Sequence, residues 1–197
     1  MHWEGEKRRR LRRLEEAIER GEVDGPAIPV LEAINALPDY CTTSSCSGRV
    51  IVLHEPEVGD KRRAEFLAKW HEPPVDVDRV REAVRRAPDE GITWLKAQPP
   101  LFHVLCRDLE AARRLRAVAS EAGFKASSIR SIKDTKVVVE ILGSERLETP
   151  VKVHGRETVR EEAWPHLIDL CNRLLTRGHD RLKRLVRAVK GLKEDGE

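Results

Sequence analysis

The sequence lacks the short motifs that most often mark a cofactor or metal site. It contains no GxGxxG dinucleotide motif, no P-loop and no HExxH zinc-protease motif. Its four cysteines, Cys41, Cys46, Cys106 and Cys171, include no CxxC pair, so a zinc site of the usual spacing is not expected. The sequence therefore disfavours an ordinary Rossmann-type cofactor site and predicts no metal centre.

The sequence also lacks a membrane or export segment. No apolar run is long enough to span a bilayer, and no signal peptide is visible. These absences predict a reducing, cytoplasmic setting without membrane contact, in which the cysteines mostly serve as small buried apolar residues.

Charge is abundant but locally uneven. Charged residues make up 36% and hydrophobic residues 40% of the 197 residues, and the net charge is only +3. Six of the seven residues from Lys7 to Arg13 are nevertheless basic, and the segment 181–193 is also rich in Lys and Arg. Such dense positive charge favours a nucleic acid or another anionic partner.

Apolar periodicity predicts helices at both ends of the chain and a strand-rich middle with two crossover helices. The expected helices cover residues 6–20, 29–37, 76–86 and 109–122, and two more follow residue 155. The expected strands cover residues 49–54, 64–71, 92–97, 101–106, 127–132 and 136–142. Asp76 and Asp108 are the expected N-caps of the two crossover helices.

This order of elements points to an α/β fold, with α+β as the alternative. We expect a central mixed sheet with flanking helices, in a single domain over residues 1–197 with helical N- and C-terminal segments. The similar elements on each side of Gln98-Pro99-Pro100 raise the hypothesis of two pseudo-repeated units, although no residue-level repeat is visible.

The segment Cys41–Arg49, read as a loop, concentrates hydroxyls, two thiols, a glycine and an arginine. Backbone N–H groups in such a loop can form an anion-binding nest, and Arg49 suits a carboxylate or phosphate. Gly48 can adopt conformations that other residues avoid. Cys46 is either a buried structural thiol or a nucleophile that needs a nearby base. A plain serine-rich turn is the alternative to a binding loop.

Two aromatic or titratable residues in predicted strands are further candidates. Trp70 can stack on a base or an adenine ring, or it can be a core residue that shares one face with Phe66 and Ala68. His103 is a polar residue within an apolar strand. It is either a satisfied core histidine or a cleft residue that acts as an acid or base.

Residues 42–49, Thr-Thr-Ser-Ser-Cys-Ser-Gly-Arg, resemble the signature of the tRNA wybutosine-synthesizing protein 3 family. Further matches follow in the family's order, and the resemblance covers nearly the whole chain. They are Ala68-Lys69-Trp70-His71, Phe102-His103-Val104, residues 123–127, residues 136–139 and Asn172.

The resemblance implies an S-adenosylmethionine-dependent methyltransferase that acts on N4 of the tricyclic wyosine precursor at position 37 of phenylalanine tRNA. It also implies an α/β fold distinct from the common Rossmann-like methyltransferases, with the anticodon loop as the contacted part of the tRNA. On this basis we expect His103 and Ser45 to be catalytic. The residues expected to bind the cofactor or the modified base are Thr42, Ser44, Ser45, Cys46, Gly48, Arg49, Trp70 and His103.

Two other functions remain open from the residues alone. One is a non-enzymatic RNA-binding module whose serine-rich loop grips phosphate. The other is a Cys46-dependent enzyme, such as a hydrolase or thiol transferase, with His103 as its base.

Overall fold

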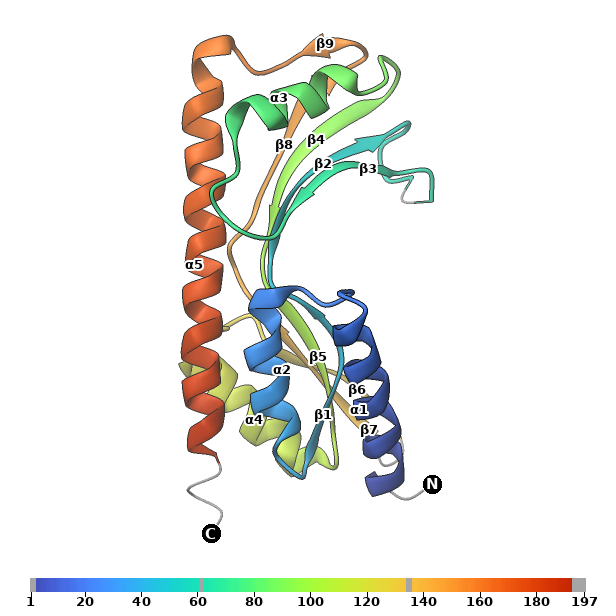
Figure 1. The fold of residues 1–197 in the computed structure, drawn as a ribbon, viewed down its shortest axis with the longest axis vertical. Coiled ribbons are helices and arrows are strands. Elements are labelled where there is room, and N and C mark those ends of the chain that lie inside the picture. Colours follow the sequence, from blue (N-terminus) through green and yellow to red (C-terminus); the bar gives the residue numbers. More distant parts are fainter. Residues whose placement is uncertain (1–2, 61, 134–135, 193–197) are drawn as a thin grey trace. The chain divides into compact units, whose positions relative to one another are not determined.

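The computed structural model describes residues 3–60, 62–133 and 136–192 (Figure 1). The helices in these residues are α1 (Trp3–Glu19), α2 (Ile28–Asn35), α3 (Val77–Arg86), α4 (Leu109–Glu121) and α5 (Trp164–Gly191). The strands are β1 (Tyr40–Cys46), β2 (Arg49–Glu55), β3 (Glu65–Trp70), β4 (Ile92–Gln98), β5 (Leu101–Cys106), β6 (Ser128–Lys133), β7 (Lys136–Leu142), β8 (Leu147–Val153) and β9 (Arg156–Glu157). None of the described helices is both long and apolar enough to cross a membrane.

The chain folds into two compact units. The first contains the residues up to 47, residues 100–144 and those from 178 on, and the second contains residues 48–99 and 145–177. Each unit has its own sheet, with the strand orders β1-β5-β7-β6 and β3-β2-β4-β8-β9. The expected α/β class, distinct from a Rossmann fold, is confirmed.

The strands form two antiparallel sheets instead of the single mixed sheet that we expected. The difference lies in how the crossover helices are used. Helix α4 leads from β5 to the sheet edge at β6, and the hairpin β6–β7 then brings β7 back antiparallel to β5. In the second unit, α3 follows the hairpin β2–β3 instead of preceding one. The two units therefore differ in the order of their elements.

Several predicted elements are confirmed closely. The strands at residues 101–106 and 136–142 have the expected bounds, because their near-continuous apolar character suits burial. Asp76 accepts a hydrogen bond from the N–H of Arg79 at 2.9 Å, and Asp108 accepts one from the N–H of Ala111 at 2.8 Å. Both aspartates thus cap their helices as predicted.

Three expectations about elements were wrong. The serine-rich segment is an edge strand, β1, over most of its length instead of a loop. The two C-terminal helices are one helix, α5. Gly178 lies inside this helix, where a Cβ would be 3.2 Å from the ring of Pro100, so the glycine allows the helix to pack closely there. Strand β8 was missed because Pro150 interrupts its pattern.

Each unit has its own apolar core. Phe102, Val104 and Val139 of the first sheet pack with α2 and α4, which cover one face of that sheet. In the second unit, Val50 and Leu95 pack with residues of α3 and with the first half of α5. The opposite face of the first sheet carries the polar residues described below.

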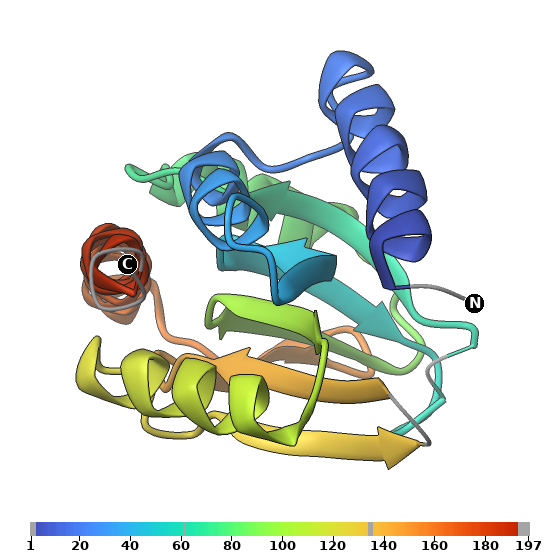
Figure 2. The same ribbon diagram turned by 90° about the horizontal axis from the view of Figure 1, so that it is seen from below.

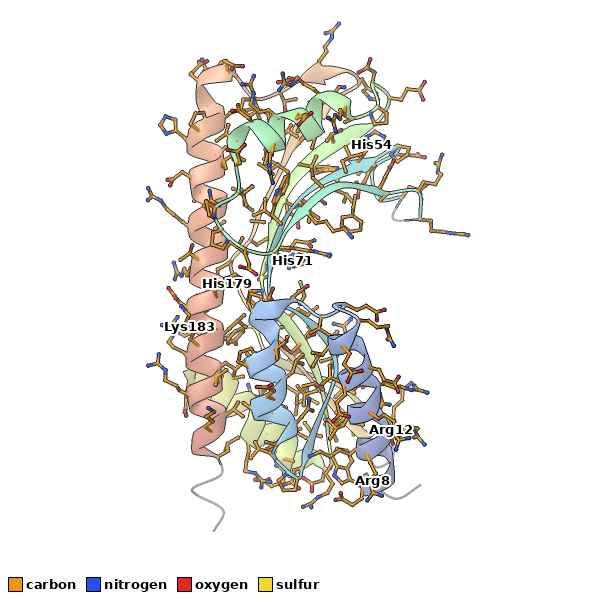
Figure 3. The ribbon with its side chains drawn as sticks, in the orientation of Figure 1. Arg8, Arg12, His54, His71, His179 and Lys183 are labelled. Carbon is orange, nitrogen blue, oxygen red and sulfur yellow. The ribbon has the colours of Figure 1, made fainter. Side chains whose placement is uncertain are left out.

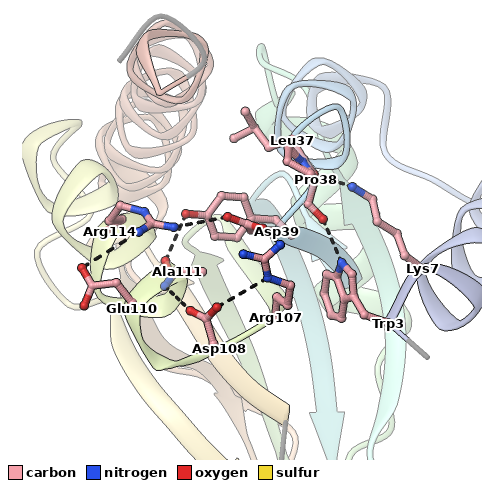
Figure 4. A network of polar contacts seen from close by, with 11 residues as sticks. Trp3, Lys7, Leu37, Pro38, Asp39, Arg107, Asp108, Glu110, Ala111 and Arg114 are labelled. Carbon is pink, nitrogen blue, oxygen red and sulfur yellow. Dashed lines mark hydrogen bonds and ion pairs between the residues drawn. The ribbon is translucent and has the colours of Figure 1, made fainter. Parts of the chain in front are cut away.

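Helix α1 is attached to the first sheet by polar contacts. Trp3 donates its indole N–H to the carbonyl of Pro38 at 2.8 Å, and the ammonium of Lys7 donates to the carbonyl of Leu37 (Figure 4). Burial lowers the pKa of Lys7. Trp3 and Lys7 therefore fix the first turns of α1 at the start of β1.

A second contact fixes the side of the sheet on which α1 lies. Glu6 is 5% exposed and accepts from Lys136 of β7 at 3.1 Å. Since neighbouring side chains of a strand alternate between faces, Lys136 points away from the core residue Val137. Helix α1 therefore lies toward the face that α4 leaves uncovered, and Figure 2 shows it apart from α2 and α4.

Burial of the cysteines predicts an alkaline loss of stability. Burial raises the pKa of the Cys106 thiol to about 12 from 9.0 in the unfolded chain. Burial of the protonated thiol stabilises the folded protein fully below pH 9.0. This stabilisation is lost as the pH rises toward the pKa that the thiol has in the folded protein. We expect the stability advantage of the wild type over Cys106→Ala to shrink above pH 9.0, by up to about 1.4 kcal/mol per pH unit. Urea unfolding between about pH 8 and about pH 10 measures this, and a constant difference would contradict it.

Candidate functional site

Strand β1 has one residue more than its partner β5 at the position of Thr43. Thr42 lies opposite Val104 and Ser44 lies opposite His103, so Thr43 forms a β-bulge. Directly opposed side chains of an antiparallel pair point to the same face of the sheet. Ser44 and His103 therefore project together from the face opposite to the core residue Val104.

Four side chains form a continuous polar row across this face. Ser44 Oγ lies 2.7 Å from His103 Nδ1, and His103 Nε2 lies 2.9 Å from Glu140 Oε2. The same carboxylate oxygen accepts from Arg130 Nη1 at 2.5 Å. The residues come from β1, β5, β7 and β6 in that order, which is the order of the strands in the sheet.

The hydrogen bonds of the row specify the tautomer of a neutral His103. An ionised carboxylate only accepts, so Glu140 requires the ring proton to be on Nε2. Nδ1 then accepts the hydroxyl proton of Ser44. His103 is 25% exposed and Glu140 is 14% exposed, whereas Ser44 is an exposed residue. Both nitrogens of His103 are occupied, so the group that can meet a ligand is the hydroxyl of Ser44.

A groove of about 410 Å³ opens beside this hydroxyl, a size within the usual range for small-molecule sites. It runs along the edge strand β1 between residues of α1 and α2. Its lining comprises Arg10, Arg13, Leu14, Ala17, Glu22, Val23, Leu31, Thr42, Thr43, Ser44 and Ser45. Ser44 belongs to both the groove and the polar row, so a molecule in the groove touches the end of the row.

The remaining residues of the serine-rich segment in the first unit have different roles. Asn35 of α2 accepts from the N–H of Thr42 at 2.8 Å and donates to its hydroxyl at 2.7 Å. The hydroxyl and the N–H of Ser47 both bond to Asp24. Ser45 lines the groove, and Cys46 is half-buried. Since the ring of His103 contacts Ser44 and Glu140, it does not provide the base that a Cys46 nucleophile was expected to have.

Gly48, Arg49 and Trp70 belong to the second unit. Gly48 has a φ of 92°, in the region that favours glycine. Arg49 donates to Gln98 at 2.7 Å, and its guanidinium lies 5.1 Å from the ring centroid of Phe66. Trp70 is half-buried against the second core. The roles of these three residues in binding stay predictions.

The expectation that Phe66, Ala68 and Trp70 share a face was wrong. The pairing of β2 with β3 shifts between Val52 and Leu53, so that Ala68 and Phe66 occupy successive positions and Leu67 is extra. The bulge breaks the period of two. Phe66 is 43% exposed and lies against Arg49 and Lys69, whereas Ala68 and Trp70 pack on the core.

Sequence reasoning missed Glu140, Arg130 and Asn35. A signal for Glu140 exists, since it is an acidic residue in an apolar strand, as His103 is a polar one. Its significance depends on the pairing of Glu140 with His103 across β7 and β5, which the local sequence does not specify.

The basic segments are only partly available to a partner. Lys7 is buried, Arg10 is paired with Glu6 at 2.9 Å, and Arg181 is buried and donates to Ser144 at 2.8 Å. Exposed basic residues remain on both helices, among them Arg8 and Arg12 on α1 and Lys183 on α5 (Figure 3).

Comparison with known proteins shows to which family this chain belongs. The model of the family described as methyltransferase TYW3 matches residues 5–191. A tRNA(Phe) 7-((3-amino-3-carboxypropyl)-4-demethylwyosine(37)-N(4))-methyltransferase of Pyrococcus abyssi is 40% identical over 191 residues, which cover 97% of each chain. A protein of the same name from Archaeoglobus fulgidus is 37% identical, over 99% of this chain and 97% of its own.

Solved structures agree. The PH1069 protein of Pyrococcus horikoshii superposes with a TM-score of 0.89 at 38% identity, covering 94% of this chain and 95% of its own. A hypothetical protein from Aeropyrum pernix gives a TM-score of 0.75 at 28% identity, covering 87% of this chain and 99% of its own. With the match over nearly the whole length, the family expected from the serine-rich segment is confirmed, and this chain belongs to the methyltransferase TYW3 family.

Proposed function

We propose that this protein transfers a methyl group from S-adenosylmethionine to N4 of 7-(3-amino-3-carboxypropyl)-4-demethylwyosine at position 37 of phenylalanine tRNA. The observation that carries the proposal is the Ser44–His103–Glu140 row, which ends at a groove lined by the family's serine-rich segment. The names of relatives that are 37–40% identical to this chain support the reaction and the substrate.

The residues of the groove suit such a cofactor or base. Leu14, Ala17 and Leu31 offer an apolar wall for a flat ring, while Arg13 and the hydroxyls of β1 offer polar contacts. S-adenosylmethionine supplies, when bound, a methyl carbon whose bond to a positively charged sulfur breaks, leaving the electron pair on sulfur, as the bond to N4 forms. The protein therefore has to align the acceptor nitrogen and remove its proton.

The polar row provides a path for that proton. In the proposed step the hydroxyl of Ser44 accepts the proton from N4 while it passes its own proton to His103 Nδ1. The ring becomes an imidazolium, and Glu140 stabilises the positive charge through Nε2–H. Arg130 in turn holds the carboxylate of Glu140. The proton acceptor is thus His103, acting through Ser44.

Several other expectations about this protein stay predictions. These are the binding roles of Thr42, Cys46, Gly48, Arg49 and Trp70, and the action of residues 1–197 as one methyltransferase domain. The catalytic role that we expected for Ser45 is proposed for Ser44 instead, because the hydroxyl of Ser44 is the one bonded to His103. A cytoplasmic setting, recognition of the anticodon loop and the lack of a metal requirement also stay predictions. The target base lies in a single-stranded loop, so no duplex has to open for it to enter a groove.

The proton path predicts different effects for two neighbouring serines. We expect Ser44→Ala and His103→Ala each to lower the single-turnover methylation rate about 100-fold, a usual size for general-base catalysis. Ser45→Ala, whose hydroxyl is not bonded to His103, should change this rate less than tenfold by the same reasoning. The measurement is mass spectrometry of nucleosides from precursor tRNA.

The double variant Ser44→Ala/His103→Ala serves as the control. If the two residues act as one path, it is no slower than either single variant. Multiplied losses, or a larger loss for Ser45→Ala than for Ser44→Ala, would contradict the path.

Glu140 is a positioning residue, and its effect is visible by spectroscopy. In ¹⁵N NMR we expect neutral His103 to carry its proton on Nε2, because the carboxylate accepts there. In Glu140→Gln the amide can donate or accept, so both tautomers appear and the methylation rate falls. The exposed His166 serves as internal reference and keeps its tautomer. A wild-type ring protonated on Nδ1 would contradict the assigned path.

The exposed arginines of α1 predict salt-dependent binding of tRNA. Removing one phosphate-binding side chain should reduce the slope of log affinity against log salt by about 1. We expect Arg8→Gln/Arg12→Gln to flatten this slope more than Lys183→Gln/Arg187→Gln on α5, because α1 forms a wall of the groove. Fluorescence anisotropy with labelled tRNA measures both slopes. A wild-type affinity independent of salt would remove phosphate binding from the proposal.

A further inference from the structure

We infer that Arg13 holds the carboxylate of an α-amino-acid chain, the 3-amino-3-carboxypropyl group, in the groove beside Ser44. This inference rests on the proposed function and names the ligand chemistry that one wall of the groove recognises. The same group occurs in both reactants. It is bonded to the sulfur of S-adenosylmethionine, and it is the side chain named in the substrate of the relatives.

Among the charged residues that line the groove, Arg13 is the uncompensated one. Arg10 is bonded to Glu6 at 2.9 Å, and Glu22 is bonded to Arg20 at 2.8 Å. Arg13 also lines the groove and is exposed, and no carboxylate in residues 3–60, 62–133 and 136–192 lies within ion-pair distance of it. A guanidinium presents a planar fork of donors that matches a carboxylate.

The groove also offers groups for the rest of such a chain. The carboxylate of Glu22 lines it as well, but both of its oxygens accept from Arg20, at 2.8 and 3.0 Å, so its charge is already paired. Leu14 and Ala17 offer an apolar surface for a short aliphatic chain. The hydroxyl of Ser45 has no partner among the described side chains and is available to the ligand. Together with Arg13, these features fit a short aliphatic chain that ends in a carboxylate.

The groove lies beside the proposed reaction centre. Ser44 lines it and ends the proton path, so the reacting nitrogen and methyl group have to lie beside Ser44. In both reactants the amino-acid chain is only a few bonds from the reacting centre. A carboxylate partner is therefore expected on a wall of the same groove, and α1 supplies one.

The test uses Arg13→Gln, with Arg12→Gln as the matched control. Arg12 is the neighbouring exposed arginine of α1, but it lines a separate hollow with Lys7 and Leu11. Calorimetry compares S-adenosylmethionine with methylthioadenosine, which lacks the amino-acid chain. Anisotropy compares precursor tRNAs with and without the aminocarboxypropyl group on base 37.

If Arg13 holds the cofactor's chain, Arg13→Gln weakens S-adenosylmethionine binding at least about tenfold and leaves methylthioadenosine binding unchanged. If it holds the substrate's chain, the loss is confined to the tRNA that carries the group. Arg13→Lys should restore part of either loss. Arg12→Gln removes a proposed phosphate contact, so it should weaken both tRNAs equally and leave the binding of S-adenosylmethionine and methylthioadenosine unchanged.

Equal weakening of both tRNAs by Arg13→Gln would identify a phosphate contact and overturn the inference, as would wild-type affinities for all four ligands. A failure of the proposed function is distinguishable, because it appears in the wild type as absent methylation and absent binding of S-adenosylmethionine. That result would overturn both proposals.

Discussion

The bulge at Thr43 is the local constraint on which the site depends. Without the extra residue, Thr43 would lie opposite His103, and every later side chain of β1 would change faces. With it, Ser44 meets His103 while Ser45 lies opposite the core residue Phe102. A bulge leaves part of the backbone unpaired and is easiest to accommodate at a sheet edge, which is where β1 lies.

The groove depends on a second constraint, the polar attachment of α1. The residues of this helix that are buried are Glu6 and Lys7, not leucines. Burying charge is costly unless every group is paired, and here the ammonium meets the Leu37 carbonyl while Glu6 meets Arg10 and Lys136. Arg10 and, after it, Lys136 lower the pKa of Glu6 and so keep it ionised. These paired contacts hold the first turns of α1 against the first sheet, and the following turns, with Arg13, lie along the groove beside β1.

The sequence predicts elements where local pattern and burial agree, as in β5, β7 and the helices capped by Asp76 and Asp108. It fails where a distant contact overrides the local pattern. The hydroxyl-rich β1 reads as a loop until it pairs with β5, and the C-terminal segment reads as two helices although it forms the single helix α5. The candidate site shows the same limit. Ser44 and His103 are visible as unusual residues, but Glu140 and Arg130 join them only through strand register.

Strand alternation separates two tasks within the serine-rich segment. Ser44 points to the face where His103 and Glu140 can take up a proton, and its neighbour Ser45 points to the other face, while both line the groove. Methyl transfer from a sulfonium needs no covalent intermediate, so the thiol of Cys46 has no necessary part in it. What the reaction does need is an aligned nitrogen and an outlet for one proton. An edge strand suits this reaction. The neighbouring strands of the sheet carry the residues that take up the proton, and the unpaired edge of the strand leaves room for the ligand.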